Sequence, residues 1–167
     1  MDSDRLILAC ATTAEARAGA RAGLPVVLVG LGGINGVPEQ PMVSFGLAGA
    51  LDGLQTGAVI DAVRIVDEGG RTIWEGPGLG VPGAVRGTIL ATDRVVDDPA
   101  ERARLHEATG ADAVDLESAI LASSGRLQGV LRAVSARSAR RARTPRELHL
   151  DEQTRAPGSA AIVLRRR

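Results

Sequence analysis

Apolar runs of strand length alternate with polar or glycine-rich stretches along the chain as far as Ser135. Buried strands of a parallel sheet have this appearance, with about four to eight consecutive apolar residues between turn signals. The pattern predicts strands at residues 6–11, 26–30, 42–46, 86–92, 113–116 and 128–135. Two further runs, 56–68 and 71–75, flank Gly69-Gly70, a pair that favours the tight turn of a β-hairpin.

Helix signals occur between these runs. Thr12 or Thr13 can cap the alanine-rich segment that follows, and Asp98 can cap the segment that begins at Pro99. A third helix is predicted at residues 117–126, between the last two strands.

This order of elements predicts an α/β fold. We expect a single three-layer α/β/α domain spanning residues 1–167, with a central mixed, mostly parallel sheet of about six or seven strands. The connection at residues 31–41 is unusual, because parallel neighbours need a crossover of about a dozen residues and this one is rich in Gly and Pro. The arginine-rich segment 137–144 has no apolar periodicity, and we expect it to be solvated and mobile.

Composition narrows the class of protein. Hydrophobic residues make up 44% of the chain, with one Phe, one Trp and no Tyr, so the core must be built from aliphatic side chains. Twenty basic and twenty acidic residues give a formal net charge of zero. That balance argues against nucleic acid as the partner, because binding to a phosphate backbone needs a basic face.

Location and cofactors can also be addressed from the sequence. No apolar run approaches the length of a membrane span, and the N-terminus lacks the basic region of a secretory signal. The single Cys10 cannot form an internal disulfide. We therefore expect a cytoplasmic protein without a membrane span. Nothing in the sequence resembles a metal site, and we expect neither a metal nor a cofactor.

Two segments carry the residues of chemical interest. Residues 110–135 (GADAVDLESAILASSGRLQGVLRAVS) place an acidic strand end, a helix and a buried strand in series, and residues 42–66 (MVSFGLAGALDGLQTGAVIDAVRIV) are rich in glycine. In this order the segments resemble the sugar-side and phosphate-side elements of the nucleoside phosphorylase and methylthioadenosine/S-adenosylhomocysteine nucleosidase superfamily, which includes purine and uridine phosphorylases. The run ATGADAVDLES is most similar in character to hopanoid-associated phosphorylases.

The resemblance implies a nucleosidase or nucleoside phosphorylase that cleaves the N-glycosidic bond of a purine ribonucleoside or an adenosyl conjugate. Such a reaction needs contacts to the ribose hydroxyls, an acid for the departing base and an oriented nucleophile. The implied partner is a small-molecule nucleoside, with water or phosphate as the nucleophile. Relatives in the superfamily are homo-oligomers, and we expect the same here.

The sugar side of the implied site centres on Glu117. This residue matches the glutamate that binds the ribose 2′- and 3′-hydroxyls in the superfamily, and it follows a strand, where α/β sheets bind ligands. Leu116 stands where relatives have a Met that packs on the sugar. The alternative interpretation is that Glu117 only begins a helix, where a carboxylate interacts favourably with the helix dipole.

The phosphate or water side centres on residues 44–49 (SFGLAG). This hexapeptide resembles a loop that presents backbone N–H groups and a hydroxyl to the nucleophile, and an ordinary tight turn is the alternative. Arg132 is expected to pair with a carboxylate, as it does in relatives. The residues that the resemblance assigns to this side are Gly30, Ser44, Gly46, Ala48, Gly49 and Arg132.

The remaining candidates lie elsewhere along the chain. Glu15 matches the glutamate that orients water in methylthioadenosine/S-adenosylhomocysteine nucleosidases, so Glu15 and Glu117 are the predicted catalytic residues. An exposed helix residue without a role is the alternative for Glu15. Phe45 and Ser135 are candidates for the base side, and Phe45 is equally a candidate for the core.

One departure from the superfamily pattern bears on catalysis. Relatives end the strand that corresponds to LRAVS with a Ser-Asp pair whose Asp protonates the purine, whereas here Ser135 is followed by Ala136. Loss of a general acid costs about 10²- to 10⁴-fold in rate. The alternative function is therefore a catalytically degenerate nucleoside-binding or assembly protein on the same fold.

Overall fold

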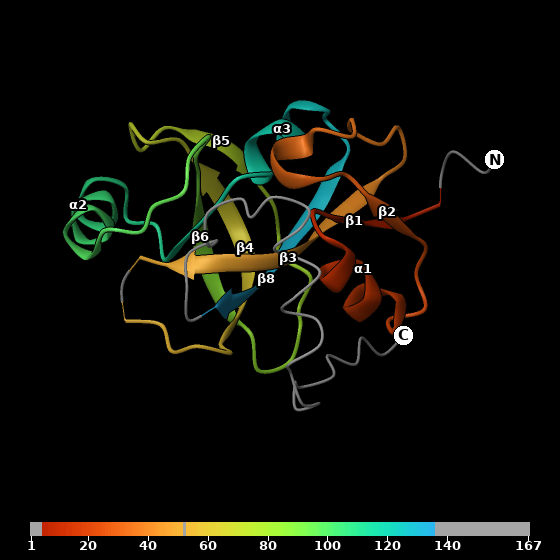
Figure 1. Cartoon of the computed structure of the whole chain (residues 1–167), viewed down its shortest axis with the longest axis horizontal. Helices are drawn as coiled ribbons and strands as arrows, with labels where there is room; N and C mark the ends of the chain where they lie inside the picture. The colour runs from red at the N-terminus through yellow and green to blue at the C-terminus, as the bar shows by residue number, and fades with distance from the viewer. Residues whose placement is uncertain (1–4, 52, 136–167) are drawn as a thin grey trace, which may run out of the picture.

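The computed structural model describes residues 5–51 and 53–135, arranged as a sheet with three α-helices (Figure 1). The elements in chain order are β1 (Ile7–Cys10), α1 (Thr13–Ala20), β2 (Val26–Leu28), the 3-10 helix η1 (Leu31–Gly33), β3 (Met42–Ala50), β4 (Val59–Val66), β5 (Thr72–Glu75), β6 (Val85–Ala91), α2 (Pro99–Thr109), β7 (Ala113–Asp115), α3 (Ser118–Ser123) and β8 (Leu127–Ser135). The segment 137–144, for which we predicted mobility, lies outside the described residues.

The predicted helices are confirmed, with one change of length. Thr12 and Asp98 are the N-caps of α1 and α2, as their residue types predicted. Helix α3 is shorter than the predicted 117–126, because the chain leaves the helix at Ser124 and turns at Gly125.

The strands form one mixed sheet. Within the described residues five strand pairs are parallel and three are antiparallel, which confirms a mostly parallel sheet. Among the described residues the sheet has eight strands, one for each of the eight runs, where we expected about six or seven in the sheet. The hairpin predicted around Gly69-Gly70 is present as the antiparallel pair β4 and β5.

The sheet does not form a simple open layer. Starting from β3, the pairing passes through β7, β6, β4 and β8 and then returns to β3. Strands β3 and β8 lie side by side in parallel over most of their length. Because the pairing curls back on itself and the helices are few, the three-layer α/β/α arrangement predicted from the sequence is not confirmed.

The connection after β2 is longer than predicted, because β2 ends at Leu28, and it reaches the length of about a dozen residues that a parallel crossover needs. Strands β2 and β3 are not neighbours, because β1 lies between them and pairs in parallel with both. The connection at residues 29–41 therefore passes over β1, and it contains η1. Gly32 of η1 has a φ of 61°, a left-handed conformation that glycine adopts without steric cost.

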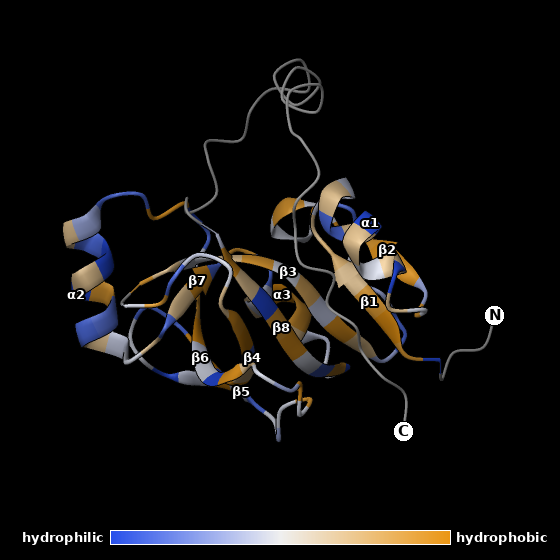
Figure 2. Ribbon diagram, turned by 90° about the horizontal axis from the view of Figure 1, so that it is seen from below, coloured by the Kyte–Doolittle hydropathy of each residue, from blue (hydrophilic) through white to orange (hydrophobic). Residues whose placement is uncertain are grey.

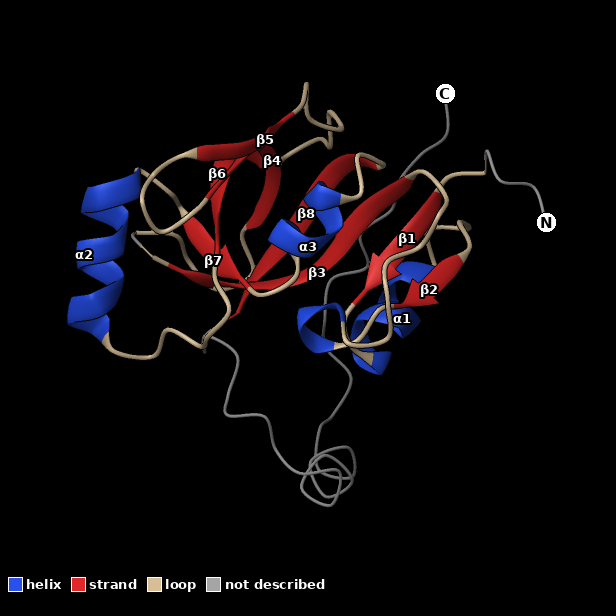
Figure 3. Cartoon of the chain, turned by 90° about the horizontal axis from the view of Figure 1, so that it is seen from above, coloured by secondary structure: helices blue, strands red, loops and turns tan. Residues whose placement is uncertain are grey.

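The core lies largely between the curled strands. It is aliphatic, as the composition predicted, and includes Ile60, Ile65, Ile89 and Val130. Figure 2 shows the hydrophobic residues concentrated along these strands, whereas α2 is mostly hydrophilic. Figure 3 shows α2 at one end of the molecule and α1 with β2 at the other. Among the described residues, no helix is long and apolar enough to cross a membrane.

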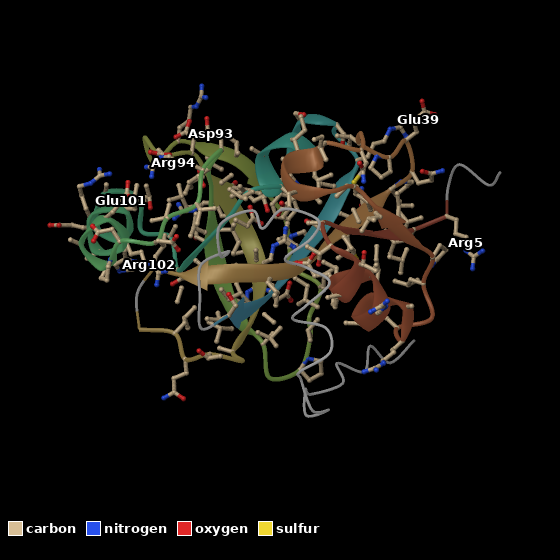
Figure 4. All side chains as sticks on the ribbon, in the orientation of Figure 1. Arg5, Glu39, Asp93, Arg94, Glu101 and Arg102 are labelled. Atoms are coloured by element: carbon tan, nitrogen blue, oxygen red, sulfur yellow. The ribbon has the colours of Figure 1, made fainter. Side chains whose placement is uncertain are left out.

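Ion pairs hold α2 against the segment that precedes it (Figure 4). Arg94 contacts Glu101 of α2 at 2.7 Å and Glu68 at 3.2 Å, and the Arg102 Nε donates to the Val96 carbonyl at 3.1 Å. These ion pairs are solvent-exposed, so they contribute little to stability. Burial of Leu105 on its inner face is the stronger attachment of this helix.

The connection between β5 and β6 is fixed by a buried carboxylate. Asp61 of β4 is 2% exposed and accepts hydrogen bonds from the backbone N–H groups of Leu79, Gly80 and Val81 at 2.7–3.3 Å. The Leu79 side chain fills the space over Gly129 of β8, where a Cβ would lie 2.6 Å from Leu79 Cδ2. This connection therefore covers one face of β4 and β8.

Replacement of Asp61 should detach this connection. We expect Asp61→Ala to lower the free energy of unfolding by about 2–4 kcal/mol, because three backbone donors lose a charged acceptor. Urea unfolding measures the loss. Asp67→Ala is the matched control, since Asp67 also accepts from backbone N–H groups, those of Gly69 and Arg71, but in an exposed turn. A loss no larger than that of the control would contradict the assignment.

Candidate functional site

A small, shallow pocket lies where several strand ends meet. The carboxyl ends of β1 and β2, helix α1, the middle of β3, the middle of β8 and the junction of β7 with α3 all contribute to it. The lining residues are Ala9, Ala11, Glu15, Val29, Ser44, Phe45, Gly46, Glu117 and Arg132.

A buried ion pair forms the base of the pocket. Arg132 of β8 is 2% exposed, and its Nε and Nη2 each lie 2.7 Å from Oδ2 of Asp115, at the end of β7. Nη2 also donates to the Ser44 hydroxyl at 2.6 Å, and Nη1 donates to the Leu131 carbonyl at 3.2 Å. The predicted pairing of Arg132 with a carboxylate is confirmed. All three guanidinium nitrogens are thereby engaged.

Asp115 also begins helix α3. Its carboxylate accepts from the Ser118 backbone N–H at 3.1 Å and from the Ser118 hydroxyl. This arrangement supplies the acceptor that the first turn of a helix requires. The side chain of Glu117, which occupies the N-cap position, makes no capping hydrogen bond.

Glu117 instead turns toward η1. Its Oε1 accepts from the Gly32 backbone N–H at 3.0 Å, and the residue is 6% exposed. Glu117 does begin helix α3, as the alternative interpretation expected, and its carboxylate also lines the pocket. Burial raises the pKa of Glu117, and the nearby charge of Asp115 raises it further. The Gly32 N–H and Arg132 oppose this rise.

Glu15 lines the same pocket and accepts hydrogen bonds from two segments of the chain. Its Oε2 accepts from the Thr12 backbone N–H at 2.7 Å and from the Thr12 hydroxyl at 2.9 Å, while its Oε1 accepts from the Leu47 backbone N–H at 2.8 Å. Glu15 is half-buried rather than fully exposed. It is therefore not an idle helix residue, although its role in catalysis stays a prediction.

The expected loop at residues 44–49 is a strand. These residues lie within β3, where they pair with β8 from Ser44↔Val130 to Gly49↔Ser135. Both the loop and the tight-turn interpretations were wrong, because pairing with β8 supplies the hydrogen bonds that keep a glycine-rich segment extended. Ser44 and Gly46 still line the pocket. The Ser44 hydroxyl accepts a hydrogen bond from Arg132, which lines the pocket as well.

The other predicted residues are placed as follows. Phe45 lines the pocket and also packs against the Leu8, Cys10 and Val43 cluster beneath α1. Of the remaining candidates, Ala48 is a core residue, Gly49 is buried within β3, and the Ser135 hydroxyl donates to the Ala48 carbonyl at 3.4 Å. Leu116 and Gly30 adjoin lining residues without lining the pocket themselves.

The sequence analysis missed two residues that shape the site. We predicted no role for Asp115, although an Arg132 buried in an apolar strand requires an acidic partner. Thr12 was treated only as a helix cap, yet it holds Glu15. A threonine at the N-cap followed three residues later by Glu is a capping-box signature, which would have indicated this contact.

Solved structures share this fold, whereas no family model and no curated protein sequence matches the chain. The 5′-methylthioadenosine/S-adenosyl homocysteine nucleosidase of Campylobacter jejuni is 16% identical, with 89% of this chain and 93% of that one covered and a TM-score of 0.60. A futalosine hydrolase mutant of Helicobacter pylori strain 26695 is 15% identical, with 79% and 90% covered and a TM-score of 0.62.

A third structure is a mutant of the Helicobacter pylori nucleosidase with 5′-methylthioadenosine in its active site. It is 16% identical, with 78% of this chain and 84% of that one covered and a TM-score of 0.58. The chain thus has the nucleosidase fold. The expected likeness to nucleosidases is confirmed for the fold.

The raised pKa of Glu117 predicts a gain in stability on its neutralisation. A carboxyl whose pKa is higher in the folded than in the unfolded protein stabilises the folded state while it is protonated. This stabilisation is lost as the pH rises from 4.5, the ordinary pKa of the group, through its raised pKa in the folded protein. Glu117→Gln keeps an acceptor for Gly32 without the charge. We expect its melting temperature to exceed that of the wild type, by a margin that grows with pH between 4.5 and 8. A difference in melting temperature that stays constant with pH, or that has the opposite sign, would contradict this prediction.

Proposed function

We propose that the chain is a nucleosidase that hydrolyses the N-glycosidic bond of a purine ribonucleoside or an adenosyl conjugate. The observation that carries this proposal is the placement of Glu117. Its carboxylate is buried at an energetic cost, makes no capping bond to its own helix and lines a pocket that also contains Glu15. Perturbed carboxylates in a pocket are typical of functional sites. The fold shared with known nucleosidases supports the same assignment.

Each carboxylate has a distinct role in this proposal. Glu117 accepts hydrogen bonds from the ribose 2′- and 3′-hydroxyls and stabilises positive charge as the sugar ring becomes cationic. Glu15 orients the nucleophile and accepts its proton. Arg132 neutralises Asp115, so the negative charge available to the ribose is that of Glu117.

The charges around the pocket favour water over phosphate as the nucleophile. Of the described residues that line it, Glu15 and Glu117 are acidic and Arg132 is the one cation. The N–H groups of Arg132 already serve Asp115, Ser44 and Leu131. An incoming phosphate dianion would therefore meet two carboxylates without a free positive partner, whereas a water molecule can donate to either carboxylate.

A nucleoside panel tests the reaction and the nucleophile together. Purine ribonucleosides and adenosyl thioethers are incubated with the protein with and without phosphate, and free base is detected by chromatography. We expect base release at equal rates in both conditions, with the free sugar (ribose, or its 5-thio derivative from a thioether) rather than a sugar 1-phosphate as the co-product. Release that requires phosphate would contradict the choice of water, and no release from any substrate would contradict the enzymatic assignment.

Glu117 should be required for ribose binding. We expect Glu117→Ala to weaken ribonucleoside binding at least about 100-fold, because hydrogen bonds to a charged acceptor contribute roughly 1.5–3 kcal/mol each and two are lost. Calorimetry measures the affinity. Glu39→Ala, which removes an exposed glutamate from the connection before β3, is the control. Unchanged affinity in a folded Glu117→Ala protein would refute the role.

A second candidate function is a nucleoside-binding or assembly protein that has lost catalysis. It is favoured by Ala136, which follows Ser135 where superfamily relatives have the acid for the leaving base; residue 136 lies outside the described residues. For an enzyme with an impaired acid, we expect Ala136→Asp to increase base release from adenosine-like substrates about 10²-fold or more. p-Nitrophenyl riboside should show little change, because its leaving group needs no proton. Equal effects on both substrates, or none, would favour the second candidate.

A further inference from the structure

Helix α1 begins with a reciprocal pair of hydrogen bonds between Thr12 and Glu15. The Thr12 hydroxyl accepts from the Glu15 backbone N–H at 3.3 Å and donates to Glu15 Oε2 at 2.9 Å. The Thr12 backbone N–H donates to the same oxygen at 2.7 Å. This is a complete capping box, which satisfies two donors at the start of the helix.

The same carboxylate is bound to the sheet through its other oxygen. Glu15 Oε1 accepts from the Leu47 backbone N–H at 2.8 Å and lies over Gly46 of β3. A Cβ on Gly46 would be 2.5 Å from Oε1, so the carboxylate reaches this position only because residue 46 has no side chain. Thr12, at the start of α1, therefore holds Oε2 of Glu15, and the Leu47 N–H of β3 holds Oε1.

A carboxylate offers about four acceptor positions, two on each oxygen. Thr12 occupies two on Oε2 and Leu47 occupies one on Oε1, so one position remains on Oε1, the oxygen above β3. In most capping boxes the acidic side chain serves only its helix. Here Glu15 lines the pocket together with Ser44, Gly46 and Glu117.

We propose that Thr12 is a positioning residue for the reaction: its hydroxyl fixes Glu15 so that the remaining lone pair of Oε1 receives the proton of the attacking water. This inference rests on the proposed function. It goes further by making the N-cap of α1 a part of the catalytic machinery. Without the hydroxyl, one donor to Oε2 disappears and the carboxylate can rotate away from Leu47.

The test compares Thr12→Ala and Thr12→Ser with a cap variant elsewhere. Asp98→Ala is the matched control, because Asp98 caps α2 by accepting from the Glu101 N–H at 2.9 Å and does not line the pocket. Loss of either cap should cost similar stability. We expect Thr12→Ala to lower kcat about 10- to 100-fold with KM within about 3-fold of the wild type, because misplacement of a catalytic group acts mainly on the chemical step. Thr12→Ser should retain nearly full kcat, and Asp98→Ala should leave kcat unchanged.

Two outcomes would overturn the proposal. One is an unchanged kcat in a folded Thr12→Ala protein. The other is an equal loss of kcat in Thr12→Ala and Asp98→Ala, which would assign the effect to stability.

A second measurement does not depend on turnover. The amide resonance of Leu47 should shift and its hydrogen exchange should accelerate in Thr12→Ala, but not in Thr12→Ser or Asp98→Ala, because the bond to Glu15 Oε1 is loosened. If the wild type releases no base from any substrate, the proposed function fails while this measurement still decides whether Thr12 positions Glu15. An unaltered Leu47 amide in Thr12→Ala would overturn the positioning role.

Discussion

The buried ion pair between Arg132 and Asp115 is the interaction on which the site depends. It joins the middle of β8 to the end of β7, and through the Ser44 hydroxyl it reaches β3 as well. Removal of one partner from such a pair costs about 3–5 kcal/mol, because the other charge is left uncompensated in the core. A pair of apolar residues could fill this volume with comparable stability. What the ion pair adds is geometry: it fixes three strands at one point and compensates the charge of Asp115.

This compensation defines the environment of Glu117. With Asp115 paired, Glu117 has a single backbone donor, the Gly32 N–H, and no direct ion pair among the described residues. The fold therefore does not fully stabilise the charged form of this carboxyl, and its pKa is raised. A buried acceptor that lacks some of its hydrogen-bond donors can bind a ligand that provides them. In the proposed function, the hydroxyl groups of the sugar would be these donors.

Local features of the structure could be predicted from the sequence, and long-range pairing could not. The caps at Thr12 and Asp98 and the turn at Gly69-Gly70 depend on neighbouring residues, and the structure has them all. The curl of the sheet depends on β8 pairing with both β3 and β4, which no local pattern encodes. The same pairing explains the error at residues 44–49. The two-segment resemblance nevertheless brought Glu117 and Ser44 together, and they do line one pocket.

The glycines show why a sequence pattern can indicate the right residue for the wrong reason. Gly46 was taken as part of a loop that presents backbone N–H groups, but it lies in an extended strand and its φ is not positive. Its small size is what matters, because a Cβ would displace the Glu15 carboxylate. Gly32, by contrast, needs its left-handed φ so that its N–H can point at Glu117. One glycine therefore makes room for a carboxylate and the other supplies a donor to one, and both acids line the same pocket.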